Sequence, residues 1–321
     1  MKLIADSGST KTAWCIVGNS PHTLHTQGIN PFQLSEEDIC AILRRELLPQ
    51  LQPILSQRAG IQGENPSVPH GKAAGEEDLE VFFYGAGCTP EKAPVVASAL
   101  RHALGPQAHI DVQSDMLGAA RGLCGRQSGI VAILGTGSNA CHYDGETLHA
   151  GNPALGYILG DEGSGAYIGK RLVGDILKHQ LPDDLCQRFF EETHETQASI
   201  LQKVYREPLP NRFLASLSPF CIKHRQHAAI QLLLVDCFKQ FFQRNILTAA
   251  WDTDERTVHF VGSIAHHYAE ELTTAAIQCG CQVGRIMQSP LEGLITYHQA
   301  PSPEQALKET YKTMNDRPTR P

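Results

Sequence analysis

Short apolar segments alternate with amphipathic ones along this chain, and most of the apolar segments end in glycine or another small residue. At the start they predict strands, at 2–5, 13–18 and 23–28. The turn Asp6–Thr12 joins the first two of these strands. An amphipathic run from Ser35 to about Leu48 predicts a helix, because Ser35 is a favourable N-cap and acidic residues fill the first turn after it.

The alternation continues to the middle of the chain. The segment EVFFYGAGC predicts a buried strand that ends in glycines. Thr89-Pro90 predicts the start of a helix, since it offers a cap and a proline at the first helical position. HIDVQ predicts another strand, and a helix over Asp115–Leu123 follows it.

A second series of strands begins with GIVAILGTGSN, in which Asp144-Gly145 is a suitable hairpin turn. Beyond Gly163 the pattern is helical up to about Ala249. TVHFVGSIAHH then predicts a strand, a loop and a helix, and QVGRIMQ predicts a last strand. A final helix is expected over Pro290–His298.

The two halves of the chain repeat one order of elements: strands, a loop of small residues, helices, a strand, a glycine turn and a helix. FFYGAG in the first half and HFVGSIA in the second occupy equivalent places. This repetition predicts an internal duplication of an α/β unit. Two similar lobes that face one another leave a cleft between them, where ligands commonly bind.

Two segments do not fit the alternation. Residues 60–78 are rich in glycine, proline and glutamate and have no periodicity, so we interpret them as a flexible surface insertion. The tail from Ala300 to Pro321 contains four prolines and many polar residues, and it is expected to be frayed. A length of 321 residues is enough for two domains.

Charge and cysteine spacing narrow the class of protein. With 27 basic and 34 acidic residues the net charge is −7, which argues against nucleic acid or an anionic membrane as the main partner. The ten cysteines are scattered from Cys15 to Cys281 without a C-x-x-C pair, which is typical of buried thiols in a reducing compartment. No signal peptide or long apolar run is recognisable, so a cytoplasmic location is expected.

Two loops of small residues carry the candidate chemistry. Each follows an apolar strand, at Asp6–Thr12 and at Gly135–Ser138. Glycine lets the backbone approach a ligand closely, and successive amides in such a turn form a concavity that binds anions. Thr10 and Lys11 could hold a phosphate, and Asp6 could bind Mg²⁺. Either loop alone could be an ordinary glycine turn. The presence of two such loops, each after an apolar strand, favours a phosphate-binding site. The Walker and the dinucleotide-binding glycine patterns are both missing.

Five motifs occur in the order found in one family of ATPases: DSGSTKT, SDMLGAARGL, ILGTGSN, GYILGDEGSG and FVGSIA. On these motifs the chain resembles the BadF/BadG/BcrA/BcrD ATPase family, and most of all its N-acetylglucosamine kinase-like branch, within the superfamily of sugar kinases, heat-shock ATPases and actin. The likeness runs from about Met1 to His298, apart from the 60–78 insertion.

The resemblance implies a fold and an activity. The fold would be α/β, with two duplicated actin-like ATPase (ribonuclease H-like) lobes and a cleft between them. The first lobe would comprise 1–118 with 289–321, and the second 119–288. The activity would be an ATP- and Mg²⁺-dependent kinase for N-acetylglucosamine or a related amino sugar, with O6 as the expected acceptor. A small sugar would be the substrate, and the resemblance leaves a homodimer open.

The resemblance also assigns roles to individual residues. Asp115 would be the catalytic base, and Asp6 would bind the metal. The residues implied for nucleotide binding are Asp6, Gly8, Ser9, Thr10, Lys11, Thr136, Gly137, Gly262 and Ser263. Those implied for sugar binding are Asn30, Asp115, Ser138, Asn139, Gly156 and Asp161.

For three of these residues the sequence alone allows a structural explanation. Asp115 could simply cap the helix that follows, unless Ser114 does so. Asp161, next to Glu162, could complement a helix dipole rather than bind hydroxyls. Asn30 precedes a proline and could be a turn residue.

Two features set limits on the kinase interpretation. The segment PALGYILGDEG has Leu155 and Tyr157 where human-type sugar kinases have a tryptophan environment, so the identity of the hexosamine stays open. The other branch of the family activates 2-hydroxyacyl-CoA dehydratases through an iron–sulfur cluster, and the cysteines to consider are Cys88, Cys124 and Cys141. A non-catalytic sensor of sugar or nucleotide is a third hypothesis.

Overall fold

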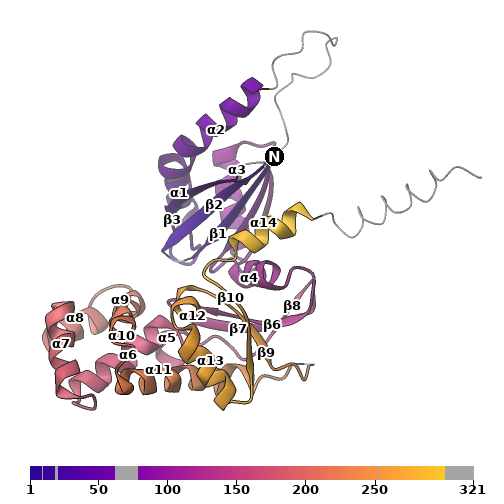
Figure 1. Ribbon diagram of the computed structural model, residues 1–321. Coiled ribbons are helices and arrows are strands. Elements are labelled where there is room, and N and C mark those ends of the chain that lie inside the picture. Colours follow the sequence, from indigo (N-terminus) through magenta and orange to yellow (C-terminus); the bar gives the residue numbers. More distant parts are fainter. Residues whose placement is uncertain (9, 19–20, 62–78, 252, 301–321) are drawn as a thin grey trace, which may run out of the picture.

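Two five-stranded sheets with the same internal order form the framework of the protein (Figure 1). A computed structural model describes residues 1–8, 10–18, 21–61, 79–251 and 253–300. The predictions of a flexible insertion at 60–78 and of a frayed tail after Ala300 therefore lie almost wholly outside the described residues.

The first sheet has the order β3-β2-β1-β4-β5. Its strands are β1 (Lys2–Ser7), β2 (Lys11–Val17), β3 (His22–Gln27), β4 (Glu80–Gly85) and β5 (His109–Ser114). The β1–β2 and β2–β3 pairs are antiparallel, whereas β1–β4 and β4–β5 are parallel. All of these strands were predicted, to within two residues at the ends.

The second sheet has the order β10-β9-β6-β7-β8. Its strands are β6 (Gly129–Leu134), β7 (Ser138–Tyr143), β8 (Leu148–Ala150), β9 (Thr257–Val261) and β10 (Gln282–Met287). β6 pairs antiparallel with β7 and parallel with β9, as β1 pairs with β2 and β4. The two sheets therefore share one topology, which confirms the predicted duplication, and β4 and β9 are equivalent strands.

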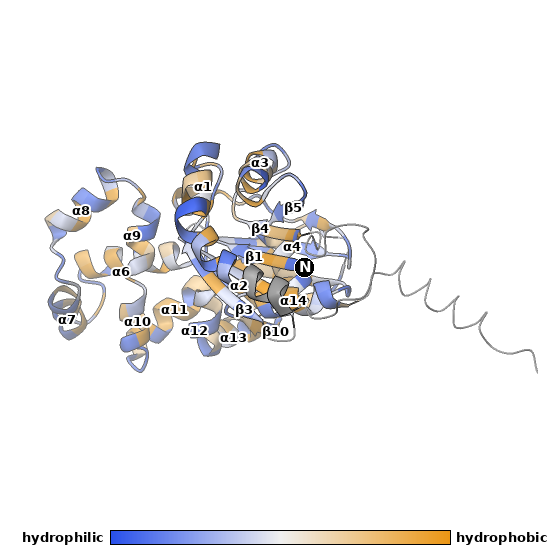
Figure 2. Cartoon of the chain, turned by 90° about the horizontal axis from the view of Figure 1, so that it is seen from above, coloured by the Kyte–Doolittle hydropathy of each residue, from blue (hydrophilic) through white to orange (hydrophobic). Residues whose placement is uncertain are grey.

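Alternation along the strands places helices on both faces of the first sheet. Leu3, Ala5 and Phe83 are buried with α1 (Glu36–Ile42) and α3 (Ala93–Leu104) on one face. Ile4 and Tyr84 are buried on the other face, against α14 (Leu291–Gln299). Hydrophilic and hydrophobic residues occur side by side on both α1 and α3 (Figure 2).

Two helix boundaries in the first lobe differ from the prediction. Ser35 caps α1 as expected, in a reciprocal pair of hydrogen bonds with Asp38. The helix does not end near Leu48, however, but continues through a π-helical segment, η1 (Leu43–Leu47), into α2 (Leu48–Ile61). The helical run is therefore longer than predicted, and α2 contains Pro53 in its interior.

The start predicted at Thr89-Pro90 was wrong by about one turn of helix. Residues 89–92 form a turn in which the Thr89 carbonyl accepts hydrogen bonds from the Lys92 and Ala93 amides. α3 begins only at Ala93, and its first turn contains another proline. Two candidate prolines lie within one turn, and the local pattern favoured the wrong one.

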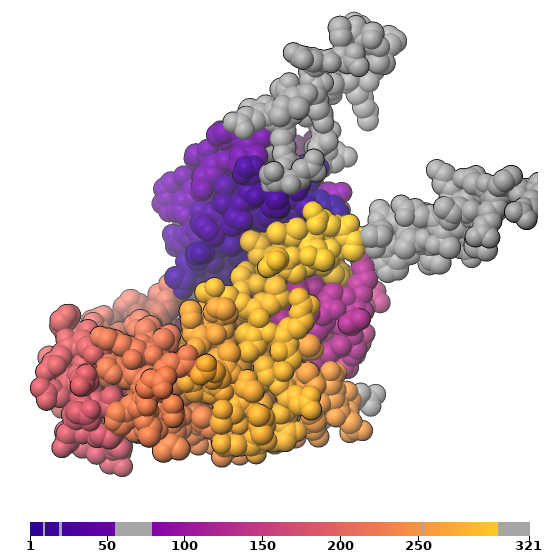
Figure 3. Space-filling model, in the orientation of Figure 1, coloured from indigo at the N-terminus to yellow at the C-terminus, as the bar shows by residue number. Residues whose placement is uncertain are grey.

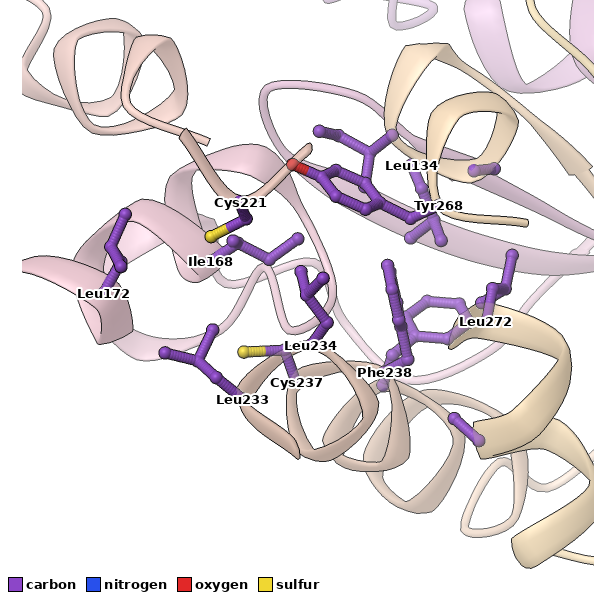
Figure 4. Packing of buried hydrophobic residues seen from close by; sticks show 14 of the residues in the cluster. Leu134, Ile168, Leu172, Cys221, Leu233, Leu234, Cys237, Phe238, Tyr268 and Leu272 are labelled. Carbon is purple, nitrogen blue, oxygen red and sulfur yellow. The ribbon is translucent and has the colours of Figure 1, made fainter. Parts of the chain in front are cut away.

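Helices make up most of the second lobe after β8, as predicted. They are α5 (Gly156–Leu159), α6 (Gly165–Leu177), α7 (Asp183–Thr193), α8 (Gln197–Tyr205), α9 (Pro210–Ser216), α10 (Pro219–Lys223), α11 (Ala228–Phe241), η2 (Phe242–Ile246), α12 (Ser263–His267) and α13 (Ala269–Gln278). α11 packs against both α6 and α13 beside the sheet, and Ile168, Leu234 and Leu272 belong to the same buried cluster (Figure 4).

One helix from each half lies between the two sheets. α4 (Asp115–Cys124) contributes Met116 and Leu123 to a core shared with the second sheet, and α14 packs on the first sheet. The two helices cross where Gly122 meets Gly293: a Cβ added at Gly293 would lie 2.0 Å from the Gly122 carbonyl oxygen. α14 fills the space between the lobes in the space-filling view (Figure 3).

The cysteines are dispersed through these cores. All ten are free thiols, and only Cys124 and Cys279 are partly exposed. The prediction of buried thiols is therefore confirmed. Among the described residues, no helix is long and apolar enough to cross a membrane.

Candidate active site

The carboxyl ends of the parallel strands in the first sheet form one edge of the cleft. Ser7 of β1 is in register with Gly85 of β4, which is in register with Ser114 of β5. Asp6 and Asp115 flank this row. Ligands of open α/β sheets bind at such an edge, so the topology brings together two carboxylates that are far apart in the sequence.

Asp115 is the first residue of α4 but is not its cap. The Ser114 hydroxyl accepts a hydrogen bond from the Leu117 amide at 3.2 Å, and it thereby fills the capping position. Burial raises the pKa of the Asp115 carboxyl to about 6, the Met116 amide opposes this by donating to Oδ1, and the charge of Asp6 adds to the rise. A carboxylate with such a pKa is suited to accept a proton near neutral pH.

Asp6 occupies the end of β1. Its Oδ2 accepts a hydrogen bond from the Ser289 hydroxyl at 2.8 Å, just before α14. Burial raises the pKa of the Asp6 carboxyl, while Ser289 and the charge of Lys11 lower it. Since a net rise means that the carboxylate is not fully compensated, Asp6 is in a state that a divalent cation would stabilise.

The first loop turns tightly between β1 and β2. The Gly8 amide donates to the Lys11 carbonyl at 3.0 Å, and Thr10 and Lys11 are exposed at the tip. Ser9, which was assigned to the same loop, lies outside the described residues.

Ser7 connects this loop to the candidate sugar residue. Its buried hydroxyl bonds to Thr12 at 2.7 Å and accepts a hydrogen bond from the Ile29 amide at 3.1 Å. Asn30 follows directly. Sequence reasoning missed Ser7, because no local pattern reports a contact between residues 7 and 29.

Asn30 forms the turn that was its alternative explanation. Its Oδ1 accepts from the Phe32 amide at 3.0 Å and packs against Gly87, whose φ of +78° only glycine adopts easily. Within the described residues, the side-chain nitrogen of Asn30 donates no hydrogen bond. The turn therefore leaves one donor available for a ligand.

The second loop is fixed to the start of α6. The Gly135 and Thr136 carbonyls accept hydrogen bonds from the Gly165 and Ala166 amides, at 2.9 and 3.1 Å. Such bonds use the free amides of the first helical turn to hold the loop in place.

Asp161 contacts the other end of this loop. Its Oδ1 accepts from the Ser138 amide at 3.3 Å, and a Cβ on Gly137 would lie 3.0 Å from its Oδ2. Asp161 has a φ of 56°, which is unusual for a residue with a side chain. Burial raises the pKa of Asp161, the Ser138 bond lowers it, and Glu162 raises it further. It does not start a helix: Ser164 caps α6 instead, so the helix-dipole explanation loses support.

Gly262 lies where β9 approaches β6. It has a φ of +125°, and a Cβ there would lie 2.2 Å from the Leu134 carbonyl oxygen, next to the second loop. Ser263 is exposed at the start of the short helix α12. Gly156, another predicted residue, is exposed at the start of α5 with a φ of +71°.

Two adjoining pockets open on the cleft. The larger, of about 1170 Å³, is lined by Ser114 and Asp115 on one side and by Asn139 on the other. The smaller, of about 320 Å³, is lined by Ser138, Asp161 and the Leu155 side chain. Residues 152–154 line both pockets, which are therefore adjacent. The larger pocket brings Asp115 and Asn139 together, and Ser138 and Asp161 line the smaller one.

The two phosphate-loop candidates are not joined. Among the described residues, no hydrogen bond links the Asp6–Thr12 loop to the Gly135–Ser138 loop. One described hydrogen bond that does join the two lobes lies elsewhere: Arg212 Nη2 donates to Gln33 Oε1 at 3.1 Å.

Comparison with known proteins agrees with this architecture. A scan against protein-family models and a search of curated proteins both find no match. Solved structures do match. The paired sheets and the cleft define a two-lobed, actin-like sugar kinase fold, as the sequence predicted.

A crystal structure from Porphyromonas gingivalis, described as a "Putative N-acetylglucosamine Kinase", is 44% identical to this chain. The alignment covers 93% of this chain and 98% of that one, with a TM-score of 0.82. The chain therefore belongs to the same family as that protein, among the sugar kinases. A protein from Chromobacterium violaceum with the same description is 20% identical, covers 92% of this chain and 98% of its own, and has a TM-score of 0.60, which supports the fold alone.

Proposed function

We propose that the protein transfers the γ-phosphoryl group of ATP to a hydroxyl, with O6 expected, of N-acetylglucosamine or a related amino sugar. The observation that carries this proposal is Asp115: a carboxylate with a pKa of about 6, at the edge of a cleft pocket, in a family of sugar kinases. The description of the Porphyromonas protein supports the choice of amino sugar.

Asp115 would accept the proton of the sugar hydroxyl as its oxygen attacks the γ-phosphorus. The bond from that phosphorus to the bridging oxygen breaks, and ADP leaves. Asn30, Ser138, Asn139, Gly156 and Asp161 would hold the sugar. The free amide nitrogen of Asn30 suits a hydroxyl or an N-acetyl carbonyl, and Asp161 offers acceptor oxygens beside the smaller pocket.

The nucleotide would lie along both loops. Gly8, Thr10 and Lys11, with Ser9, would hold one part of the triphosphate, and Thr136 and Gly137 another. Gly262 and Ser263 would lie on the adenosine side. Asp6 would bind Mg²⁺. Its buried carboxylate accepts a hydrogen bond from Ser289 and has Lys11 only as a neighbouring charge, so a cation would compensate its negative charge. Mg²⁺ bound there would neutralise charge on the phosphates.

The finer assignments belong to the same proposal. We place the protein in the BadF/BadG/BcrA/BcrD family, in its N-acetylglucosamine kinase-like branch, and in the cytoplasm. We assign 1–118 with 289–321 to the first lobe and 119–288 to the second. The alternative of a dehydratase activator gains no support from the thiols, because Cys88 lies in the first-lobe core and Cys124 and Cys141 in another.

A coupled assay of ADP release over a panel of hexoses and hexosamines, with Mg²⁺, tests the function. We expect N-acetylglucosamine or a close relative to raise turnover well above the sugar-free rate. If no sugar does so, the protein is not a sugar kinase. Visible absorption after anaerobic purification would instead indicate the iron–sulfur class.

A further inference from the structure

A third pocket, away from the two cleft pockets, lies next to the crossing of α4 and α14. It has a volume of about 250 Å³ and lies between the end of α4, β10 and α14. We call it the hinge pocket and define it by four of its lining residues, Arg121, Arg126, Arg285 and Tyr297. The proposed kinase reaction uses none of these residues.

Its three arginines lack acidic partners. The described ion pairs of arginine involve Arg45, Arg171, Arg225 and Arg244. Among the described residues, none of the three hinge-pocket arginines pairs with a carboxylate. Glu255 and Arg285 both act electrostatically on Cys124, but no ion pair between the two is described.

Arg121 is the most confined of the three. Its Nη1 donates to the Tyr84 hydroxyl at 2.8 Å, and its guanidinium carbon lies 5.0 Å from the centre of the Tyr297 ring. Its Nε is buried and has no partner within the described residues. A buried donor without an acceptor costs free energy, which a bound acceptor would recover.

Arg126 and Arg285 complete the rim from exposed positions. The Arg126 guanidinium lies 4.7 Å from the centre of the Tyr297 ring, and Arg285 Nη1 donates to the Leu123 carbonyl at 2.7 Å. Both side chains keep further donors available, because a guanidinium carries five N–H groups.

The neighbouring histidine reports the same excess of positive charge. His298 is buried against Phe82, and its Nε2 bonds to the Tyr84 hydroxyl at 2.9 Å. Burial lowers the pKa of His298 to about 4, and the charges of Arg121, Lys2 and Arg126 contribute to this shift. The pocket is thus a positive site on a chain whose net charge is −7.

We propose that the hinge pocket binds a phosphate dianion, either inorganic phosphate or the phosphate group of a small metabolite. Guanidinium forks match phosphate oxygens in a bidentate manner, and three of them would neutralise a dianion. The volume lies below the range typical of drug-sized ligands, which favours a small anion over a nucleotide.

The location gives such a ligand a mechanical role. Arg121 and Arg126 belong to α4 and the residues after it, Arg285 to the second sheet, and Tyr297 to the helix that packs on the first sheet. A bound phosphate would therefore contact the crossing helices on which the lobes must move, and would favour one angle between them.

Isothermal titration at fixed ionic strength, with sodium phosphate in one arm and glucose 6-phosphate in the other, tests the proposal. We expect saturable binding in at least one arm, weakened about tenfold or more in Arg126→Gln and in Arg285→Gln. Arg188→Gln, which removes an exposed arginine on α7, is the matched control and should bind as the wild type does. The arm that binds more tightly identifies the source of the phosphate.

Two results would overturn the proposal. One is no saturable binding in either arm. The other is binding that Arg126→Gln and Arg285→Gln leave unchanged while Thr136→Ala weakens it, which would place the anion on the cleft loops. Arg126 is exposed and its guanidinium lies over the Tyr297 ring, so its substitution should leave the fold intact, as circular dichroism would verify.

Discussion

Asp115 and Ser114 divide two tasks that the sequence could not separate. Either residue could have capped α4, and the Ser114 hydroxyl does so. The Asp115 carboxyl is therefore not required to cap the start of the helix, although it accepts one bond from the Met116 amide. Its substitution should affect chemistry more than local structure.

The first prediction concerns activity. In Asp115→Asn we expect kcat to fall by about 10²–10⁴-fold, the range typical of a lost general base. The dissociation constant of ATP should change little, because the residue acts on the acceptor. In the wild type, kcat/KM should fall about tenfold per pH unit below pH 6, since a base must be deprotonated to work.

Steady-state kinetics from pH 5 to 8 and nucleotide titration at pH 7.5 measure these effects. A parallel loss of ATP affinity in the variant would contradict the assigned role. So would a wild-type profile that stays flat through pH 6.

The second prediction concerns the stability of the same variant: Asp115→Asn should lose activity but gain stability. Because burial raises the pKa of folded Asp115 to about 6, ionisation costs the folded state free energy. The cost is absent below about pH 4, where both states are protonated, grows between pH 4 and 6, and is complete above that. Asp115→Asn should therefore raise the free energy of unfolding at pH 7.5 by up to about 3 kcal/mol.

Urea denaturation at pH 7.5 and at pH 4 would measure this difference. The asparagine can still accept the Met116 bond, so a gain at pH 7.5 that disappears at pH 4 isolates the charge. Destabilisation at pH 7.5 would mean that the carboxylate is held by favourable contacts.

At the residue scale, the sequence identified functional side chains at the ends of strands, but not the residues that hydrogen-bond to those side chains. Asp6 and Asp115 could be found because each follows an apolar strand. Ser289, which bonds to Asp6 across 283 positions of sequence, could not be found, because a lone serine before a helix carries no signal of a distant partner.

At the scale of elements, the crossing of α4 and α14 depends on two glycines. The third prediction is that Gly293→Ala lowers the free energy of unfolding by about 1–3 kcal/mol or more, because its Cβ would overlap the Gly122 backbone. The added methyl group would meet backbone atoms of Gly122, which cannot move aside as a flexible side chain could.

Gly174→Ala is the control for this substitution. Gly174 lies inside α6 with open space around it, so alanine there should stabilise the helix by up to about 1 kcal/mol. Denaturation midpoints of both variants decide the matter. If Gly293→Ala were as stable as Gly174→Ala, the two helices would not be in close contact at that point.

Element types were easier to predict than element ends. The strands follow from short apolar runs that end in small residues, and that signal is local. The start of α3 was misjudged because two prolines, Pro90 and Pro94, could each lie in the first turn of a helix. The helical run predicted to end near Leu48 continues to Ile61 and contains Pro53 in its interior, where a proline is usually unfavourable. Packing against the rest of the protein decides whether a proline lies in the first turn of a helix or in its interior.

At the scale of the whole molecule, duplication explains why two loops recur. In each sheet a loop of small residues joins the central strand, β1 or β6, to its antiparallel neighbour, so the shared topology puts the two loops in equivalent places. The repeat of motifs predicted this arrangement. The hinge pocket was not predicted, because its arginines come from separate elements of both halves.

The fourth prediction is that sugar and nucleotide bind cooperatively through lobe closure. The larger pocket, at about 1170 Å³, exceeds the usual range for small ligands, and no described hydrogen bond joins the two loops. A triphosphate held by both loops therefore requires the lobes to approach. Bringing the lobes together costs free energy. The ligand that binds first would supply part of it, so the second ligand would bind more tightly.

Titration of a non-hydrolysable ATP analogue with and without saturating N-acetylglucosamine measures the coupling. We expect the sugar to tighten nucleotide binding about 5–150-fold, and the nucleotide to tighten sugar binding by the same factor, since coupling is reciprocal. Asp115→Asn, which removes the base but not the loops, should keep the coupling. Independent affinities would show that the two sites do not share a closing motion, even in an active kinase.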